Sequence, residues 1–132
     1  MNHDNKRLMQ QIFEALAQGN GRPFVDAMAD DFCWVIPGRS TWSRRWEGKQ
    51  AVVSDLLRPL FERFADTYVN RAHRFIAEGE HVVVECSGEV TTKTGKRYDN
   101  DYCMVFRIVD GRLRQLTEYM DTELATAALG AP

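Results

Sequence analysis

The stretch that most constrains the fold of this chain covers residues 98–121, with the sequence YDNDYCMVFRIVDGRLRQLTEYMD. Along its first half, large apolar side chains fall at every second position, which is the period of a β-strand with one buried face. Asp110 and Gly111 then supply a two-residue turn, and a second apolar run returns between residues 113 and 120. The pattern predicts one long β-hairpin that forms the wall of a core or a pocket.

The register of the returning run decides which carboxylate lies on the buried face of this hairpin. Leu113 and Leu116 are three positions apart, so a regular strand would place them on opposite faces. One extra residue at positions 114–115, a β-bulge, would turn both leucines inward. Glu118 and Met120 would then share the inner face with Leu116.

The alternative is a regular strand, in which Asp121 would face inward beside Asn100. We favour the bulge because it buries both leucines and a methionine, and the burial of apolar surface is the main favourable contribution to folding. Asp121 would then precede a short final helix, residues 122–129, as its N-cap.

Helical periodicity comes first in the chain and strand periodicity follows, which is typical of an α+β fold. We expect an amphipathic helix, a second helix that starts at Pro23, and a third helix that Pro59 kinks or breaks. These helices are expected at residues 4–18, from 23 to near 30–31, and at 50–64, with further strands at 32–36, 68–77 and 81–91. The aromatic loop 38–48 is expected to fold over another part of the molecule instead of extending into water. Residues 1–132 are predicted to form one domain, a curved antiparallel sheet wrapped over N-terminal helices.

Composition and charge argue against several classes of protein. With a formal net charge of -2, the chain has no electrostatic reason to bind nucleic acid or a membrane surface. The N-terminal sequence lacks the apolar core of a signal peptide and no apolar run approaches a membrane span, so we expect a cytoplasmic protein. Cys33, Cys86 and Cys103 fit no metal-binding motif and are expected to be buried free thiols. We expect no metal and no organic cofactor.

Three segments of the chain resemble the nuclear transport factor 2-like superfamily. They are ADDFCWVIPG at residues 29–38, WEGKQAV at 46–52 and VDGRLRQLTEYMD at 109–121. The chain is most similar to the SnoaL-like branch, which includes polyketide cyclase-like, ketosteroid isomerase-like and limonene epoxide hydrolase-like proteins. The resemblance implies a cone-shaped α+β barrel with a hydrophobic cavity.

One of the catalytic groups that the resemblance implies has a counterpart here. The isomerase-like members place a carboxylate late in the first strand, and residues 34–37 contain none. The set used by epoxide hydrolase-like members falls on Glu85, Ser87 and Glu118, and only Glu118 keeps a carboxylate in its matching place. The cyclase-like members require a hydrophobic cavity and one carboxylate near the end of the last strand, which Glu118 supplies.

Glu118 is therefore the first candidate for proton transfer. Among apolar neighbours its carboxyl would be desolvated, which raises the pKa toward neutral pH. The alternatives are an ion pair with an inward arginine such as Arg71, or a partly hydrated carboxylate at the mouth of the pocket. Asn100 and Tyr102 alternate onto one face and could bind a substrate carbonyl or enolate, or form a satisfied polar network. His73 is expected to face inward near Ser87 and to assist as a relay, although a lone strand histidine is more often structural.

The expected ligand-binding residues are Tyr102, Trp34, Met120, Ser87 and Trp46. Core or dimer packing would explain the tryptophans equally well. The residues and the resemblance together predict a small enzyme that acts by general acid/base catalysis on a hydrophobic, carbonyl-containing molecule, as an isomerase or a cyclase does. The alternative is a domain of the same fold that binds a small ligand or dimerises without catalysis.

The sequence also allows a prediction about the opposite face of the sheet. Cys103, Val105 and Val84 are expected to alternate outward, where a lone chain would expose them to water. This apolar stripe and the family resemblance favour a homodimer that packs sheet to sheet.

Overall fold

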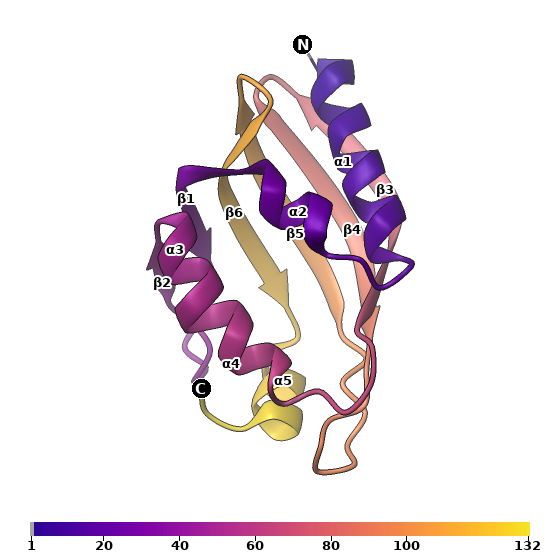
Figure 1. Ribbon diagram of the computed structural model, residues 1–132, viewed down its shortest axis with the longest axis vertical. Helices are drawn as coiled ribbons and strands as arrows, with labels where there is room; N and C mark the ends of the chain where they lie inside the picture. The colour runs from indigo at the N-terminus through magenta and orange to yellow at the C-terminus, as the bar shows by residue number, and fades with distance from the viewer. Residues whose placement is uncertain (1) are drawn as a thin grey trace.

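The computed structural model describes residues 2–132, with side chains from residue 4 onward (Figure 1). Helices and strands occur in the predicted order, helices first and a long meander afterwards. Their bounds are α1 Asn2–Leu16, α2 Arg22–Ala27, β1 Met28–Val35, β2 Arg45–Glu47, α3 Lys49–Ala51, the π-helix η1 Val52–Leu57, α4 Arg58–Phe61, β3 Val69–Glu78, β4 His81–Glu89, β5 Asp101–Val109, β6 Arg112–Met120 and α5 Thr122–Leu129.

One curved, unclosed sheet forms the back of the molecule and the helices cover its concave face (Figure 1). Its six strands follow the order β2-β1-β6-β5-β4-β3, and every neighbouring pair is antiparallel except β1 with β6. Helix α1 packs on β3 and β4, whereas α3 and η1 pack on the β1–β2 end. The predicted α+β fold is therefore confirmed.

The β5–β6 hairpin has the turn and the bulge that its sequence predicts. Asp110 and Gly111 have φ angles of 53° and 73°, the left-handed backbone that a tight hairpin turn requires. Strand pairing jumps from Arg107↔Gln115 to Ile108↔Leu113, so one residue of β6, Arg114, has no partner. The predicted bulge is confirmed, and it lets β6 bury its apolar residues on both sides of the irregularity.

The third helix is widened where its proline would otherwise break it. The amide of Arg58 donates to the carbonyl oxygen of Val53, five residues earlier, which is the π-helical spacing. Pro59 has no N–H, and its ring would clash with the carbonyl four residues before it in a regular α-helix. The π-turn over Val52–Leu57 relieves that clash, so the helix continues through α4 instead of ending.

Two predicted boundaries near residue 30 are wrong. The second helix ends at Ala27, and β1 starts at Met28 instead of residue 32. Met28 is fully buried as a strand residue, because it pairs with Leu113 of β6. The expected loop 38–48 also contains a short edge strand, β2, in which Trp46 pairs with Trp34 of β1.

A second bulge in β3 was not predicted. Pairing with β4 shifts between Ala72 and Arg74, which leaves His73 as the extra residue. The extra residue shifts the alternation of the strand by one position. The residues that face the core are therefore even-numbered before the bulge and odd-numbered after it. Asn70 lies on the inner side before the bulge, and Phe75 packs on Phe13 of α1 after it.

The C-terminal segment lies in the lower part of the fold in Figure 1. Asp121 caps α5 as predicted, because its carboxylate accepts a hydrogen bond from the amide of Leu124 at 3.1 Å. The indole of Trp42 donates to the carbonyl of Gly130 at 2.6 Å, so the loop before β2 is tied to the chain end. Within residues 2–132, no helix is long and apolar enough to cross a membrane.

Candidate functional site

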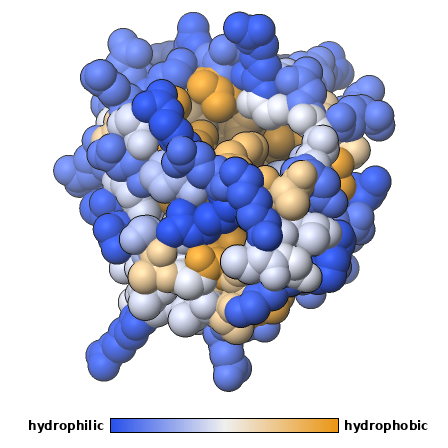
Figure 2. Space-filling view, turned by 60° about the horizontal axis from the view of Figure 1, so that its bottom comes forward, coloured by the Kyte–Doolittle hydropathy of each residue, from blue (hydrophilic) through white to orange (hydrophobic). Residues whose placement is uncertain are grey.

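A pocket of about 450 Å³ lies between the concave face of the sheet and the helices that cover it. Figure 2 shows its entrance as a hollow lined by apolar side chains and surrounded by polar ones. Its lining residues come from the helices α1, α2, η1, α4 and α5, from the strands β1, β3, β5 and β6, and from the segments between them. The lining residues are Leu16, Gly21, Arg22, Phe24, Val25, Trp34, Ile36, Trp42, Val53, Leu56, Leu57, Arg58, Leu60, Phe61, Phe64, Tyr68, Asn70, Tyr98, Tyr102, Met104, Glu118, Met120, Ala125 and Leu129.

Glu118 is the one carboxylic acid in this lining. Only 6% of its surface is exposed, and it faces Met104 across the β5–β6 pair. Burial raises the pKa of the Glu118 carboxyl from 4.5 to about 7, although a hydrogen bond from Trp34 opposes the shift. A carboxyl with such a pKa is divided between its acid and base forms near neutral pH.

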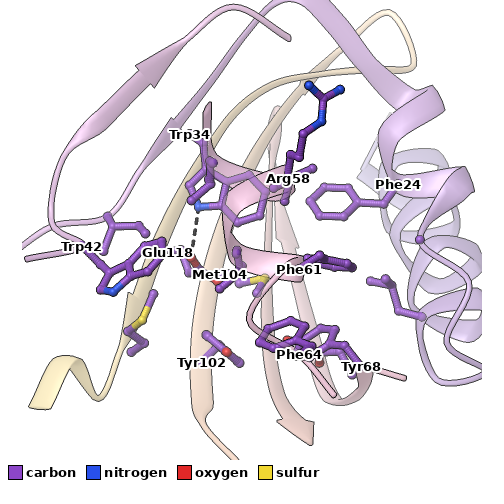
Figure 3. Close-up of a pocket in the computed structure, with 18 of the residues that line it drawn as sticks. Phe24, Trp34, Trp42, Arg58, Phe61, Phe64, Tyr68, Tyr102, Met104 and Glu118 are labelled. Atoms are coloured by element: carbon purple, nitrogen blue, oxygen red, sulfur yellow. Dashed lines mark hydrogen bonds between the residues drawn. The ribbon is translucent and has the colours of Figure 1, made fainter. Parts of the chain in front are cut away.

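The parallel pairing of β1 with β6 brings Trp34 to this carboxyl. Trp34 pairs with Leu116, and Glu118 is the next inward residue along β6. The indole Nε1–H donates to Oε1 of Glu118 at 3.0 Å, drawn as the dashed line in Figure 3. The bond fixes one carboxylate oxygen and leaves Oε2 for a ligand.

A chain of hydroxyl groups lies beside the carboxyl. The hydroxyl of Tyr98 accepts hydrogen bonds from Tyr102 at 3.3 Å and from the amide of Asn100 at 3.1 Å. Among the described residues, the one acceptor for its own proton is the sulfur of Met120, at 3.8 Å. Burial raises the pKa of both Tyr98 and Tyr102, so both stay protonated at neutral pH. A carbonyl oxygen would be a better acceptor than this sulfur, so Tyr98 can donate to a ligand.

Asn100 acts on the pocket only through Tyr98. It is almost fully buried, but it is absent from the residues that line the pocket. Its amide nitrogen also donates to the backbone carbonyl of Asp121 at 3.1 Å, and its oxygen accepts from the amide of Asp101 at 2.9 Å. All its hydrogen-bonding groups are therefore used, which matches the polar network that the sequence left open as an alternative.

The expected inward orientation of His73 and Ser87 is wrong. Because His73 is the bulged residue of β3, its side chain lies on the exposed outer face of the sheet. There its Nε2 lies 2.7 Å from the hydroxyl of Ser87, which donates to Asp101 at 2.6 Å. The alternative of an ion pair between Glu118 and Arg71 is excluded, since Arg71 points outward and pairs with Glu89.

The remaining predicted ligand-binding residues divide between the pocket and the core. Trp34, Tyr102 and Met120 line the pocket with Glu118. Trp46 is buried but does not line it; the guanidinium of Arg44 lies 5.6 Å from its ring centre.

Asn70 and Tyr68 were not predicted as site residues. Asn70 is 1% exposed and lines the pocket from β3; its amide nitrogen donates to the hydroxyl of Tyr68 at 2.9 Å. Arg71, His73 and Arg74 could have revealed it, because a regular strand cannot expose all three. A bulge among these three residues turns Asn70 inward, whereas in the regular register Asn70 would face outward.

The pocket entrance carries two exposed arginines, Arg22 and Arg58, the only cations in the lining. Figure 3 shows the guanidinium of Arg58 pointing away from the centre of the pocket, between Trp34 and Phe24. Among the described residues, no cluster of three or more His, Cys, Asp or Glu side chains is placed to hold a metal ion.

A curved sheet that is covered by N-terminal helices and encloses an apolar pocket defines a class of small α+β proteins, the nuclear transport factor 2-like proteins. Within this class the chain belongs to the SnoaL-like domain family, whose model matches residues 9–116. The predicted family is thereby confirmed. A comparison with curated protein sequences finds no match.

Solved structures share the whole fold at low sequence identity. A putative SnoaL-like polyketide cyclase from Jannaschia sp. is 17% identical, with a TM-score of 0.79 over 100% of this chain and 95% of that chain. An LEH-like epoxide hydrolase of M. tuberculosis is 22% identical, with a TM-score of 0.70 over 97% of this chain and 90% of that chain. TerC, co-crystallised with polyporic acid, is 18% identical, with a TM-score of 0.78 over 96% of this chain and 98% of that chain.

Proposed function

We propose that this protein is an enzyme that transfers a proton within a hydrophobic, carbonyl-containing small molecule, in an isomerisation or a cyclisation. One observation carries the proposal: the pocket is apolar except for a few convergent polar groups, and its single carboxylic acid, Glu118, has a pKa raised to about 7. Relatives with this fold include a putative polyketide cyclase and an epoxide hydrolase, which supports catalysis in such a pocket.

In this proposal Glu118 is the general base and then the general acid. Its free Oε2 removes a proton from the carbon next to the substrate carbonyl while Trp34 holds Oε1. The electrons of the broken C–H bond form a C=C bond, and the carbonyl oxygen becomes an enolate oxygen. Tyr98 donates its hydroxyl proton in a hydrogen bond to that oxygen, and the bond from Asn100 strengthens Tyr98 as a donor. Glu118 then returns the proton to carbon.

A pocket that only binds a small ligand is the second candidate. It is favoured by the lining of apolar side chains, which would hold a hydrophobic molecule without any chemistry. TerC, which shares this fold, was co-crystallised with an organic acid. The two candidates differ in whether Glu118 exchanges a proton with the bound molecule.

We also propose that two copies pair through the outer face of the sheet. The predicted stripe needs one correction: Val84 is fully buried in the core, because it pairs with the inward Met104. Val83, which pairs with Val105, takes its place on the outer face, and Cys103 lies in the same row as Val105. These half-buried apolar side chains support sheet-to-sheet packing.

Hydrogen–deuterium exchange tests the proposed chemistry without knowledge of the natural substrate. We would follow the loss of the α-proton signals of 2-tetralone, a hydrophobic ketone, by NMR in deuterated buffer near pH 7. The wild-type protein should accelerate exchange, and Glu118→Gln should remove about 100-fold or more of that acceleration. Asp121→Asn is the control, since that nearby carboxylate caps α5 outside the pocket and the variant should keep the acceleration.

Two results would contradict the proposal. One is saturable binding of 2-tetralone with no accelerated exchange, which would leave only the binding role. The other is acceleration that persists unchanged in Glu118→Gln, which would exclude this carboxyl as the base.

A further inference from the structure

The side-chain oxygen of Asn70 is a buried hydrogen-bond acceptor without a partner. Asn70 is 1% exposed, and its amide nitrogen bonds the hydroxyl of Tyr68, but among the described residues its Oδ1 has no donor. Leaving a buried polar atom unpaired destabilises a fold, so native proteins pair nearly all of them. Asn70 is also one of the residues that line the pocket.

Two neighbouring residues, Tyr68 and Gly88, fix the position of the Asn70 side chain. It pairs with Gly88 of β4, and a Cβ atom at Gly88 would lie only 2.5 Å from the hydroxyl oxygen of Tyr68. The absence of a side chain at Gly88 therefore lets the Tyr68 ring lie against the strand, where its hydroxyl holds the amide of Asn70. The bond to Tyr68 occupies the nitrogen side of the amide, and the oxygen is left without a partner among the described residues.

We propose that Asn70 Oδ1 is a subsite for a hydrogen-bond donor of the ligand, so that the molecule bound in this pocket is a hydroxylated hydrophobic carbonyl compound. The inference rests on the proposed function for the carbonyl group, while the hydroxyl requirement comes from Asn70 alone. A hydroxyl donates its proton to this oxygen, whereas an ether or a methyl group at the same place leaves the oxygen buried and unpaired.

The subsite is separate from the proton-transfer group. Asn70 lies on β3 and Glu118 on β6, with β4 and β5 between them. Three strand spacings correspond to about 14 Å along the sheet, and the curvature shortens the direct path. Tyr68, Tyr98 and Tyr102 line the pocket together with both residues. A ligand with its carbonyl at Tyr98 would therefore present a different part of its ring system to Asn70.

A matched pair of ligands tests the subsite directly. The probes are 6-hydroxy-2-tetralone and 6-methoxy-2-tetralone, which differ in one donor, and Kd is measured from the quenching of tryptophan fluorescence. The wild-type protein should bind the hydroxyl compound about fivefold more tightly, the ratio expected for one net hydrogen bond. In Asn70→Leu, of similar size, the preference should fall to about one. Ser87→Ala, which removes a hydroxyl from the outer face of the sheet and leaves the pocket lining intact, should keep the fivefold preference.

Each remaining result contradicts the inference. Equal binding of the two probes by the wild-type protein would mean that a water molecule satisfies Asn70, and tighter binding of the methoxy compound would mean that the subsite offers a donor. A preference that survives in Asn70→Leu would place the hydroxyl elsewhere, for example at Glu118. The wild-type comparison holds even if Asn70→Leu fails to fold. The hydroxyl preference is measured by binding, so it can stand or fall independently of the exchange experiment with Glu118→Gln.

Discussion

The indole nitrogen of Trp34 donates a hydrogen bond to a carboxylate oxygen of Glu118 at 3.0 Å, across 84 residues of sequence. Both groups are buried, so the bond acts in surroundings of low polarity, where it is strong. It stabilises the charged form of the carboxyl, against the larger effect of burial, which favours the neutral form. These two effects set the pH at which Glu118 becomes a base.

The first prediction follows from this balance. In Trp34→Phe the carboxyl keeps its burial but loses the hydrogen bond, so its pKa should rise above about 7. If the deprotonated form is the base, the exchange rate increases with pH through this pKa, and the rise should move to higher pH in the variant. The pH dependence of the exchange rate of 2-tetralone measures the shift. A rise at the same or a lower pH in Trp34→Phe would contradict the prediction.

The second prediction concerns stability and pH. Between pH 4.5 and about 7 the folded chain keeps a proton on Glu118 that the unfolded chain has lost. Because the folded state binds more protons, the free energy of unfolding contributed by this group falls as pH rises through that window. The difference between a pKa of 4.5 and one of about 7 corresponds to about 3 kcal/mol.

Glu118→Gln has no such titration, so its advantage over the wild-type protein should grow with pH. The free energy of unfolding from urea titrations should shift in favour of the variant by about 3 kcal/mol between pH 4 and pH 8. Glu89→Gln is the matched control; its carboxylate forms an exposed pair with Arg71 and should change stability by about 1 kcal/mol or less. A pH-independent difference between Glu118→Gln and wild type would show that Glu118 titrates as an ordinary carboxyl.

The inner face of β6 could be predicted because its apolar residues conflict with a regular strand. Leu113 and Leu116 can both be buried only if one residue between them is extra, and Arg114 is that residue. The position of Glu118 follows directly, as does the separation of Asp121 from the pocket. The sequence predicts that Trp34 lies on a strand, but it does not predict that this strand pairs with β6, because the residues of neither strand reveal a parallel partner.

The inner face of β3 could not be predicted in the same way. Its apolar residues are few, and Val69, Arg71, His73 and Phe75 satisfy a regular alternation as a set. The bulge at His73 reverses the first half of that strand and brings Asn70 inward instead. The alternation alone therefore gives the wrong face for Asn70, and only a bulge among Arg71, His73 and Arg74 brings it inward.

The third prediction concerns the packing of Tyr68 on Gly88. A methyl group at Gly88 would lie 2.5 Å from the Tyr68 hydroxyl, which is closer than packed atoms come, so Gly88→Ala should displace the ring and break its bond to Asn70. The overpacking should lower the free energy of unfolding by about 1–3 kcal/mol. Thermal unfolding measures this loss. Gly79→Ala is not a suitable control, because alanine at a φ of 58° is strained whatever its packing. Ser87→Ala, next to Gly88 but on the outer face, should have a smaller effect. Unchanged stability in Gly88→Ala would contradict the close packing.

The fourth prediction concerns the outer face of the sheet. Cys86 is buried in the core and Cys33 is nearly so, whereas Cys103 is half-buried on the outer face. In an isolated chain a polar thiol reagent should therefore label Cys103 first. If two copies pair through this face, labelling of Cys103 should slow as the protein concentration rises through the dimer dissociation constant. A labelling rate of Cys103 that is independent of concentration, together with a monomer in sedimentation, would contradict the proposed dimer.

The most direct test of the proposed proton-transfer site is the pKa of Glu118 in the folded protein. The carboxyl carbon of each glutamate is followed by NMR between pH 3 and pH 9 in protein labelled with ¹³C, and the signal absent from Glu118→Gln identifies the residue. Burial among apolar side chains, opposed by Trp34, predicts a pKa of about 7. A midpoint near 4.5, the ordinary value for a glutamate, would show that the carboxyl is solvated and would contradict its role as the base of this pocket.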